Sequence, residues 1–176
     1  VQGNTNMFGL VYTPSSSGRG MATAKTGSFY LTETVILPAA TPAGTRVVNS
    51  MSTAAYVNVG TGQALAIESV DIIYQAGADL GSDVAVMLAG NGALTSQLTD
   101  LNPGTGFVRA DSQSLVASGS LNIDQANNVA THVSDIYPDN FGPTALSESF
   151  LVVNDNLYVM AGPDGAATFA EVAVTM

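Results

Sequence analysis

The segment GSFYLTETVILP, residues 27–38, decides the fold class of this chain. On an extended backbone its apolar side chains fall on one face, and its tyrosine and threonines fall on the other. The apolar face consists of Phe29, Leu31, Val35 and Leu37. This two-residue period predicts a β-strand with one side in a core. Pro38 ends the strand, because proline cannot donate a hydrogen bond to a ladder.

Short apolar runs separated by Gly, Pro, Asn and Asp continue to the end of the chain, a pattern typical of an all-β domain. Further strand candidates are 47–60, 63–77, 84–90, 91–98, 106–123, 147–154, 156–162 and 167–176. The candidate at 63–77 changes phase near Glu68 and Ser69, which predicts a bulge there. The best short-helix candidate is 120–137. We predict an antiparallel β-sandwich, a jelly roll or single β-barrel, of about eight strands.

The length of 176 residues suits one domain preceded by an arm. Residues 1–27 contain TPSSSGRGMATAKTG, which has the small and flexible composition of an arm. Within it, only the segment MFGLVY at 7–12 is apolar enough to pair with a strand. We therefore expect an arm over 1–27 and the sandwich over 28–176.

The charge balance restricts the partners. The chain has 14 acidic and four basic residues and a net charge of -10, which disfavours sequence-specific binding of nucleic acid. Arg19 and Lys25, half of the basic residues, lie in the arm. An acidic, lysine-poor surface fits a salt-rich setting, halophilic or marine, because salt screens like charges. No apolar run is long enough for a membrane helix, no signal peptide is visible, and a cleaved leader stays open.

No arrangement of residues predicts catalysis. His132 is the only histidine, and although Ser134 and Asp135 follow it, no serine has the sequence around it that a nucleophile requires. Three acidic residues lie in predicted strands: Glu33, Glu68 and Asp71. They could supply a catalytic carboxylate pair only if the fold brought them together. We predict that the protein is not an enzyme.

Calcium is the one cofactor that stays open, since Asp and Asn in loops are its usual ligands. The weak candidates are Asp79, Asp83, Asn154, Asp155 and Asn156. The alternative is that these residues, like Asp164 in GPDG, form plain turns, which Asn and Asp favour because they tolerate left-handed backbone angles. We predict turns and no bound cofactor.

The segment SFLVVNDNLYVMAGPDG, residues 149–165, is apolar on both faces of its two strands. A sheet with one side in water would alternate apolar and polar residues, so both faces are predicted to be covered, by the arm or by another subunit. The predicted assembly contacts are Phe150, Leu151, Val152, Val153, Leu157, Tyr158, Val159 and Met160, with Arg19 and Lys25 in the arm.

The arm, the short strands rich in Val, Ala and Thr, and the closing segments FLVVNDNLYVMAG and ATFAEVAVTM together resemble the single jelly-roll major capsid proteins of icosahedral internal-membrane viruses of halophilic archaea and Thermus. The resemblance implies a virion shell subunit that assembles with copies of itself and with other capsid proteins, close to an internal viral membrane. It brings no catalytic residue with it. The alternative is a secreted or cell-surface adhesin or carbohydrate-binding module, with or without stabilising calcium.

Overall fold

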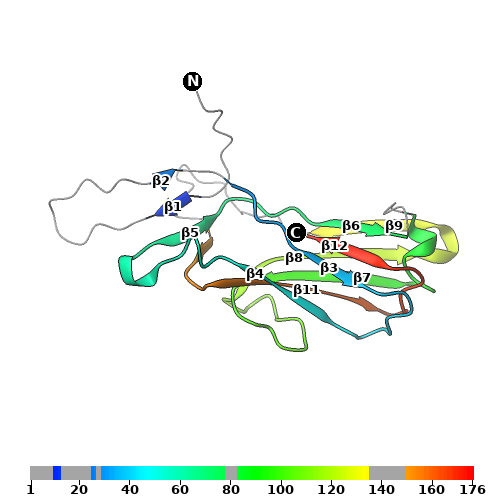
Figure 1. Ribbon diagram of the computed structural model, residues 1–176. Helices are drawn as coiled ribbons and strands as arrows, with labels where there is room; N and C mark the ends of the chain where they lie inside the picture. The colour runs from blue at the N-terminus through cyan, green and yellow to red at the C-terminus, as the bar shows by residue number, and fades with distance from the viewer. Residues whose placement is uncertain (1–9, 13–24, 27–28, 78–82, 135–149) are drawn as a thin grey trace, which may run out of the picture.

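The computed structural model describes residues 10–12, 25–26, 29–77, 83–134 and 150–176. It confirms the prediction of an antiparallel β-sandwich (Figure 1). One sheet has the strand order β4-β11-β7-β8-β9, and the facing sheet has the order β3-β12-β6. The five-stranded sheet contains β4 (Val47–Ser52), β11 (Asn156–Asp164), β7 (Gly92–Thr99), β8 (Leu115–Asp124) and β9 (Val129–Ser134). The three-stranded sheet contains β3 (Thr34–Leu37), β12 (Val172–Thr175) and β6 (Ile73–Ala76).

The core lies between these two sheets. On β3 the predicted alternation is present, because Val35 and Leu37 are fully buried while Ile36 between them is half-exposed. Phe29 and Leu31 pack against the same core although the strand begins only at Thr34. The facing side chains from the five-stranded sheet include Leu94, Leu98, Leu157 and Val159, all buried. Each such aliphatic side chain contributes about 1.5–3 kcal/mol of transfer free energy.

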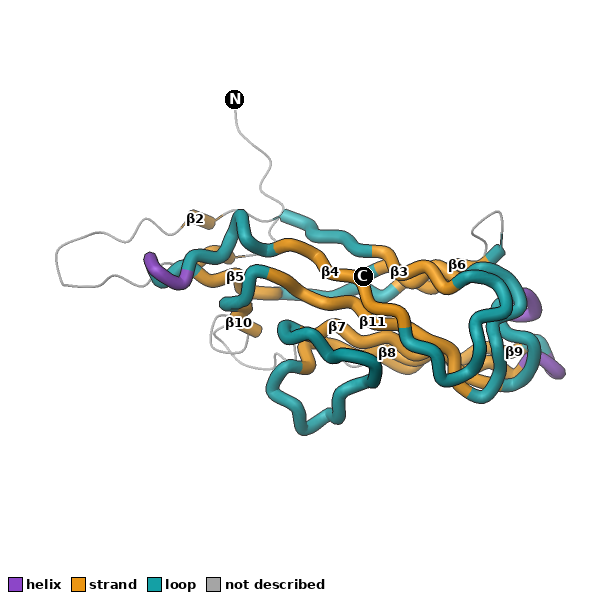
Figure 2. Tube along the Cα trace, turned by 60° about the horizontal axis from the view of Figure 1, so that its bottom comes forward, coloured by secondary structure: helices purple, strands orange, loops and turns teal. Residues whose placement is uncertain are grey.

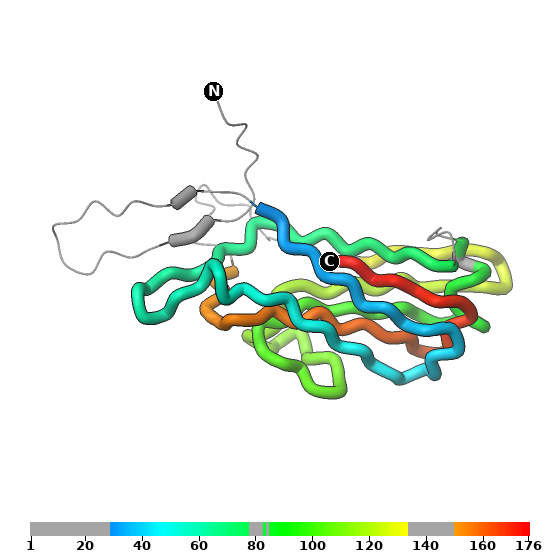
Figure 3. The backbone as a smooth tube through the Cα atoms, in the orientation of Figure 1, coloured from blue at the N-terminus to red at the C-terminus, as the bar shows by residue number. Residues whose placement is uncertain are grey.

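Strands from opposite ends of the sequence lie side by side in both sheets. The last strand, β12, pairs with β3, and Figure 3 shows it in red beside the blue segment. In the other sheet β11 pairs with β4 in register from Asn156↔Ser52 to Ala161↔Val47. The first and last strands of the sandwich, β3 and β12, are therefore neighbours in one sheet, and the second and the last but one, β4 and β11, are neighbours in the other.

A side chain of β4 joins the edges of the two sheets. Asn49 donates from Nδ2 to the carbonyl oxygen of Thr34 on β3 at 2.7 Å and to Oε1 of Glu33 at 3.2 Å. Glu33 and Met176 exchange two backbone hydrogen bonds. Because hydrogen-bonded pairs alternate with non-bonded pairs along an antiparallel ladder, the carbonyl of the next residue, Thr34, has no partner on β12. The carbonyl of Thr34 thus points away from β12, toward the side where Asn49 lies.

A third sheet projects from one end of the sandwich (Figure 1). Its order is β10-β5-β1-β2, with β10 (Phe150–Val152), β5 (Ala64–Ile67), β1 (Leu10–Tyr12) and β2 (Lys25–Thr26). The segment of the arm that was predicted to pair does so in part, since Leu10–Tyr12 aligns antiparallel to β5. The rest of the predicted arm, apart from β2, lies outside the described residues.

Two strand predictions are wrong, and two others are too long: the candidate at 106–123 is a strand only from Leu115, and that at 47–60 only to Ser52. Residues 63–77 form no single bulged strand, because β5 and β6 belong to different sheets and the chain crosses between them at Glu68–Ile72. Residues 84–90 begin as the 3-10 helix η2 (Val84–Val86), and their backbone bonds go instead to the turn before β12. Phe169 N donates to Met87 O there, and Ala89 N donates to Ala167 O. This irregular pairing lets Met87 and Leu88 be buried without forming a strand.

The predicted short helix at 120–137 is also wrong over its described part. Its residues form the end of β8, the 3-10 helix η3 (Gln125–Asn127) and β9. Asp124 caps η3 by accepting from Asn127 N, and Asn128 ends it at a φ of 52°. Helical segments are confined to the ends of the sandwich, with η1 (Val59–Thr61) opposite η2 and η3 (Figure 2).

Candidate functional site

The predicted assembly residues divide into a buried and an exposed group. Val152, Leu157, Val159 and Met160 are at most 3% exposed and belong to the interior of this chain. The prediction that they contact other subunits is therefore wrong, because their side chains are not exposed at the surface of the subunit. Phe150 packs partly buried against the core, and Tyr158 is half-buried. Only Leu151 and Val153, 48% and 51% exposed, remain available to a partner.

The second face of β11 is covered by the chain's own loop 100–114. Gln97 holds this loop with both ends of its amide, since Nε2 donates to Val108 O and Oε1 accepts from Val108 N, each at 2.9 Å. Gln97 aligns with Met160 across the β7–β11 ladder, so the two side chains share this outer face. The prediction that β11 is covered on both sides is confirmed by the burial of Leu157, Val159 and Met160, and this loop is part of the cover. For β10 the same prediction is wrong, because Leu151 is 48% exposed.

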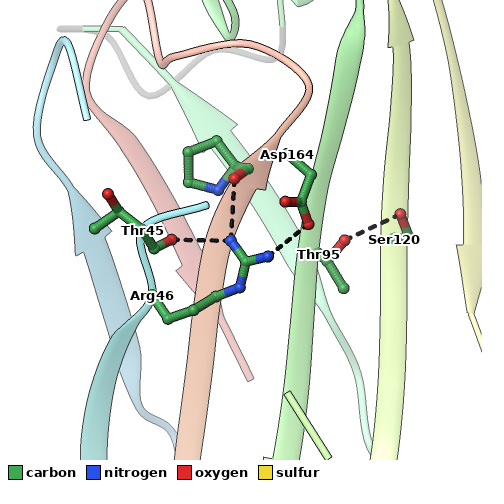
Figure 4. A network of polar contacts seen from close by, with 6 residues as sticks. Thr45, Arg46, Thr95, Ser120 and Asp164 are labelled. Atoms are coloured by element: carbon green, nitrogen blue, oxygen red, sulfur yellow. Dashed lines mark hydrogen bonds and ion pairs between the residues drawn. The ribbon is translucent and has the colours of Figure 1, made fainter. Parts of the chain in front are cut away.

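Arg46, directly before β4, is bonded to Thr45 and to the end of β11 (Figure 4). Its guanidinium donates to Thr45 O and Pro163 O at 3.0 Å, and to Asp164 Oδ2 at 2.6 Å. It also lies 4.4 Å from the ring centre of Phe107, close enough for a cation–π contact. Arg46 is therefore a structural cation, bonded within the subunit, and its side chain is only 12% exposed.

Two of the predicted assembly contacts, Arg19 and Lys25, are cations of the arm. Arg19 lies outside the described residues. Lys25 is part of β2, where its backbone aligns with Val11 of β1. The other exposed cation, Arg109, forms a 3.6 Å pair with Asp111 in which both side chains are largely in solvent.

The Asn-Asp-Asn triplet is a crossing between two sheets, since β10 and β11 do not pair with each other. Asn154 donates from Nδ2 to Asp100 O at 2.9 Å, and its own carbonyl accepts from Thr53 Oγ1. The only described residues other than glycine with positive φ are Ala40 and Asn128. The left-handed angles predicted for this turn are therefore absent, and the triplet is held by side-chain bonds instead.

No set of calcium ligands forms among the described residues. Asp83 caps η2 by accepting from Ala85 N at 3.0 Å, and Asp155 is exposed. Asp79 lies outside the described residues. Across the part of the chain that the structure describes, three or more His, Asp or Glu side chains do not gather at any point where they could hold one ion. The donors present do not fit a calcium site.

One carboxylate near the triplet has an unusual setting. Asp100 Oδ1 is buried and accepts no hydrogen bond, and burial raises the pKa of this carboxyl above its ordinary value of 3.8. A bond from its own backbone N–H opposes that rise. Asp100 lies at the end of β7, beside Asn154, so its charge weakens this end of the sandwich rather than serving a metal.

Of the candidates for catalysis in the described residues, only Glu68 and Asp71 come together. His132 is exposed on β9, and its ring meets the Tyr74 ring edge-on at a centroid distance of 5.5 Å. Burial raises the pKa of Tyr74 to about 12, with an opposing bond to Ser96. Asp135 lies outside the described residues. Glu68 and Asp71 do line one cavity, whereas Glu33 bonds to Asn49 and is absent from its lining.

The outer face of the three-stranded sheet is a surface that the sequence reading missed. By register, the outward residues form two rows across the sheet. The rows are Ile36, Ala173 and Gln75, and Thr34, Thr175 and Ile73, none of them charged. Ile36 and Ile73 are 50% and 53% exposed. The signal was present in TVIL and DIIY, where an isoleucine stands at a position that alternation assigns to solvent.

Comparison of the chain with protein-family models, with curated proteins and with solved structures finds no significant match. In the described residues no helix is long and apolar enough to cross a membrane.

Proposed function

We propose that this protein is a non-catalytic viral coat subunit that assembles with copies of itself and with other capsid proteins into an icosahedral shell. Its place would be the virion, near an internal viral membrane as the resemblance implies. The observation that carries the proposal is the order of the strands. The supporting observation is the uncharged outer face of the three-stranded sheet.

The strand order resembles that of a jelly roll and differs from it at one strand. The two sandwich sheets contain eight strands, and numbered along the chain from β3 they read 1-8-3 and 2-7-4-5-6. A jelly roll has the orders 1-8-3-6 and 2-7-4-5, so only the sixth strand, β9, attaches differently. The contact of Tyr74 on β6 with His132 on β9 brings the third and sixth strands together through side chains. Jelly rolls serve in viral shells and also in lectins.

The exposed isoleucines favour the shell over the lectin. Ile36 and Ile73 are half-exposed on a face without charge, in a chain with a net charge of -10. Two copies of so acidic a protein repel each other unless their contact surfaces are free of carboxylates. Apolar, uncharged patches of this kind are typical of contacts between proteins.

The test is the size of the purified full chain by electron microscopy and analytical ultracentrifugation. Closed particles or capsomers support a shell subunit. A monodisperse monomer at every concentration contradicts it, and glycan binding by that monomer would favour the lectin-like module, secreted or at the cell surface.

A pair of double variants tests the contact face. Ile36→Ser with Ile73→Ser is expected to weaken assembly. The matched control is Val129→Ser with Val133→Ser on β9, where the valines are 52% and 56% exposed. Assembly that survives the isoleucine changes, or that fails equally in the control, would remove this face from the proposal.

A further inference from the structure

A cavity of about 260 Å³ lies where the three sheets meet. Leu65 and Ile67 reach it from β5, Leu98 and Leu157 from the five-stranded sheet, and Thr175 from β12. The segments that precede β3 and β6 complete its walls. It opens between the sheets and shares two lining residues, Ile73 and Thr175, with the face proposed for assembly.

The floor of the cavity is apolar. Met51, Leu65, Leu98, Leu157 and Met176 line it, and each is at most 9% exposed. A cavity of about 150 Å³ with such walls stays dry and holds a benzene molecule, so a space of this size suits a larger apolar group. At about 30 Å³ for each water-sized group, it takes about eight or nine non-hydrogen atoms.

The mouth of the cavity is acidic. Of its lining residues, Glu68 is half-buried, and Ser69 and Asp71 are exposed, so the polar groups lie at the opening. Among the described lining residues there is no lysine, arginine or histidine. Neither carboxylate has a hydrogen bond or ion pair with any other described residue. Two acids without an ion pair among the described residues, beside an apolar floor, attract a cation more strongly than they would in open water.

We propose that this cavity binds a small cationic amphiphile, an alkyl or aryl ammonium, with its apolar body on the leucine and methionine floor and its ammonium at Glu68 and Asp71. The apolar body supplies affinity through burial, and the carboxylates select the charge of the head.

The test is calorimetric titration of the full chain, kept unassembled at low concentration, with three probes that share one tail. Octylammonium is expected to bind most tightly, octanol more weakly and octanoate least. Glu68→Gln is expected to lower the affinity for octylammonium about fivefold and to leave the affinity for octanol unchanged. The matched control is Glu171→Gln, an exposed carboxylate at the opposite end of β12.

The methionine methyl groups report where the probe binds. In a chain labelled at these methyls, octylammonium is expected to shift the NMR signals of Met51 and Met176, which line the cavity, and not that of Met87, which is buried elsewhere. Unshifted signals from Met51 and Met176 would overturn the site. Equal binding of octanoate, or equal loss in Glu171→Gln, would overturn the role of the mouth carboxylates.

Discussion

Individual polar residues decide how this sandwich is held together at its margins. The chain has only four basic residues, and Arg46 is used inside the subunit, against two backbone carbonyls and one carboxylate. Asp100, in contrast, keeps a buried oxygen without a partner. The two residues therefore have opposite effects on stability, and each effect can be measured.

Arg46→Met is expected to lower the free energy of unfolding by about 1–3 kcal/mol, because two carbonyls and the Asp164 carboxylate lose a charged donor. The methionine keeps the apolar stem and so isolates the loss of bonds. Urea denaturation measures the change. Arg109→Met is the control, and it should leave stability unchanged because its ion pair is solvent-exposed. Equal losses in both variants would contradict a structural role specific to Arg46.

Asp100→Asn is expected to stabilise the protein at neutral pH and to lose that advantage in acid. Since burial raises the pKa of Asp100 above 3.8, the native state retains a proton that the unfolded state has already released. Stability therefore falls as the pH rises from 3.8 through the raised pKa. Thermal unfolding of both proteins across this range gives the difference. The control is Asp155→Asn, a substitution at an exposed residue, which should not change how stability depends on pH. If it changes this dependence as Asp100→Asn does, the dependence cannot be assigned to Asp100.

At the scale of elements, the loop 100–114 acts as a cover for the five-stranded sheet. Gln97 and Arg46 attach it at Val108 and Phe107, over the face that carries Met160. The sequence shows an apolar outer position at Met160, but it does not say whether the cover comes from this chain or from another. That ambiguity is why residues of the core were predicted to be contacts between subunits.

Gln97→Met is expected to release this loop while leaving the ladder between β7 and β8 in place. The two bonds to Val108 are lost, so the amide of Val108 should exchange its hydrogen faster, as seen by mass spectrometry or NMR. Gln113→Met, at an exposed position of the same loop, is the matched control. Unchanged protection of Val108 would mean that other contacts hold the loop.

The sequence predicted those features that depend on local alternation. The buried face of β3, with Val35 and Leu37, follows from a two-residue period, and so does the antiparallel sandwich. The cavity could not be predicted, because its walls come from β5, β7, β11 and β12, which only the topology brings together. The run at 84–90 was mistaken for a strand because burial of Met87 and Leu88 has the same apolar signature with or without regular pairing.

For the whole molecule, the net charge of -10 opposes the approach of two copies. Self-association is expected to strengthen between 0.1 M and 1 M salt, over which the Debye length falls from about 10 Å to about 3 Å. Sedimentation velocity at a series of salt concentrations measures it. Association that weakens with salt would show that ion pairs, and not uncharged faces, hold the copies together.

The bond between Asn49 and Thr34 also affects how copies can meet. An edge strand with free carbonyl and amide groups is a template on which a foreign strand can add, and such growth leads to fibrils. Asn49 occupies the outward carbonyl of Thr34 on β3, so this edge is blocked at that point by the chain itself. Under the proposed function, this part of the β3 edge is closed to strand addition, which leaves the sheet faces for contacts between copies.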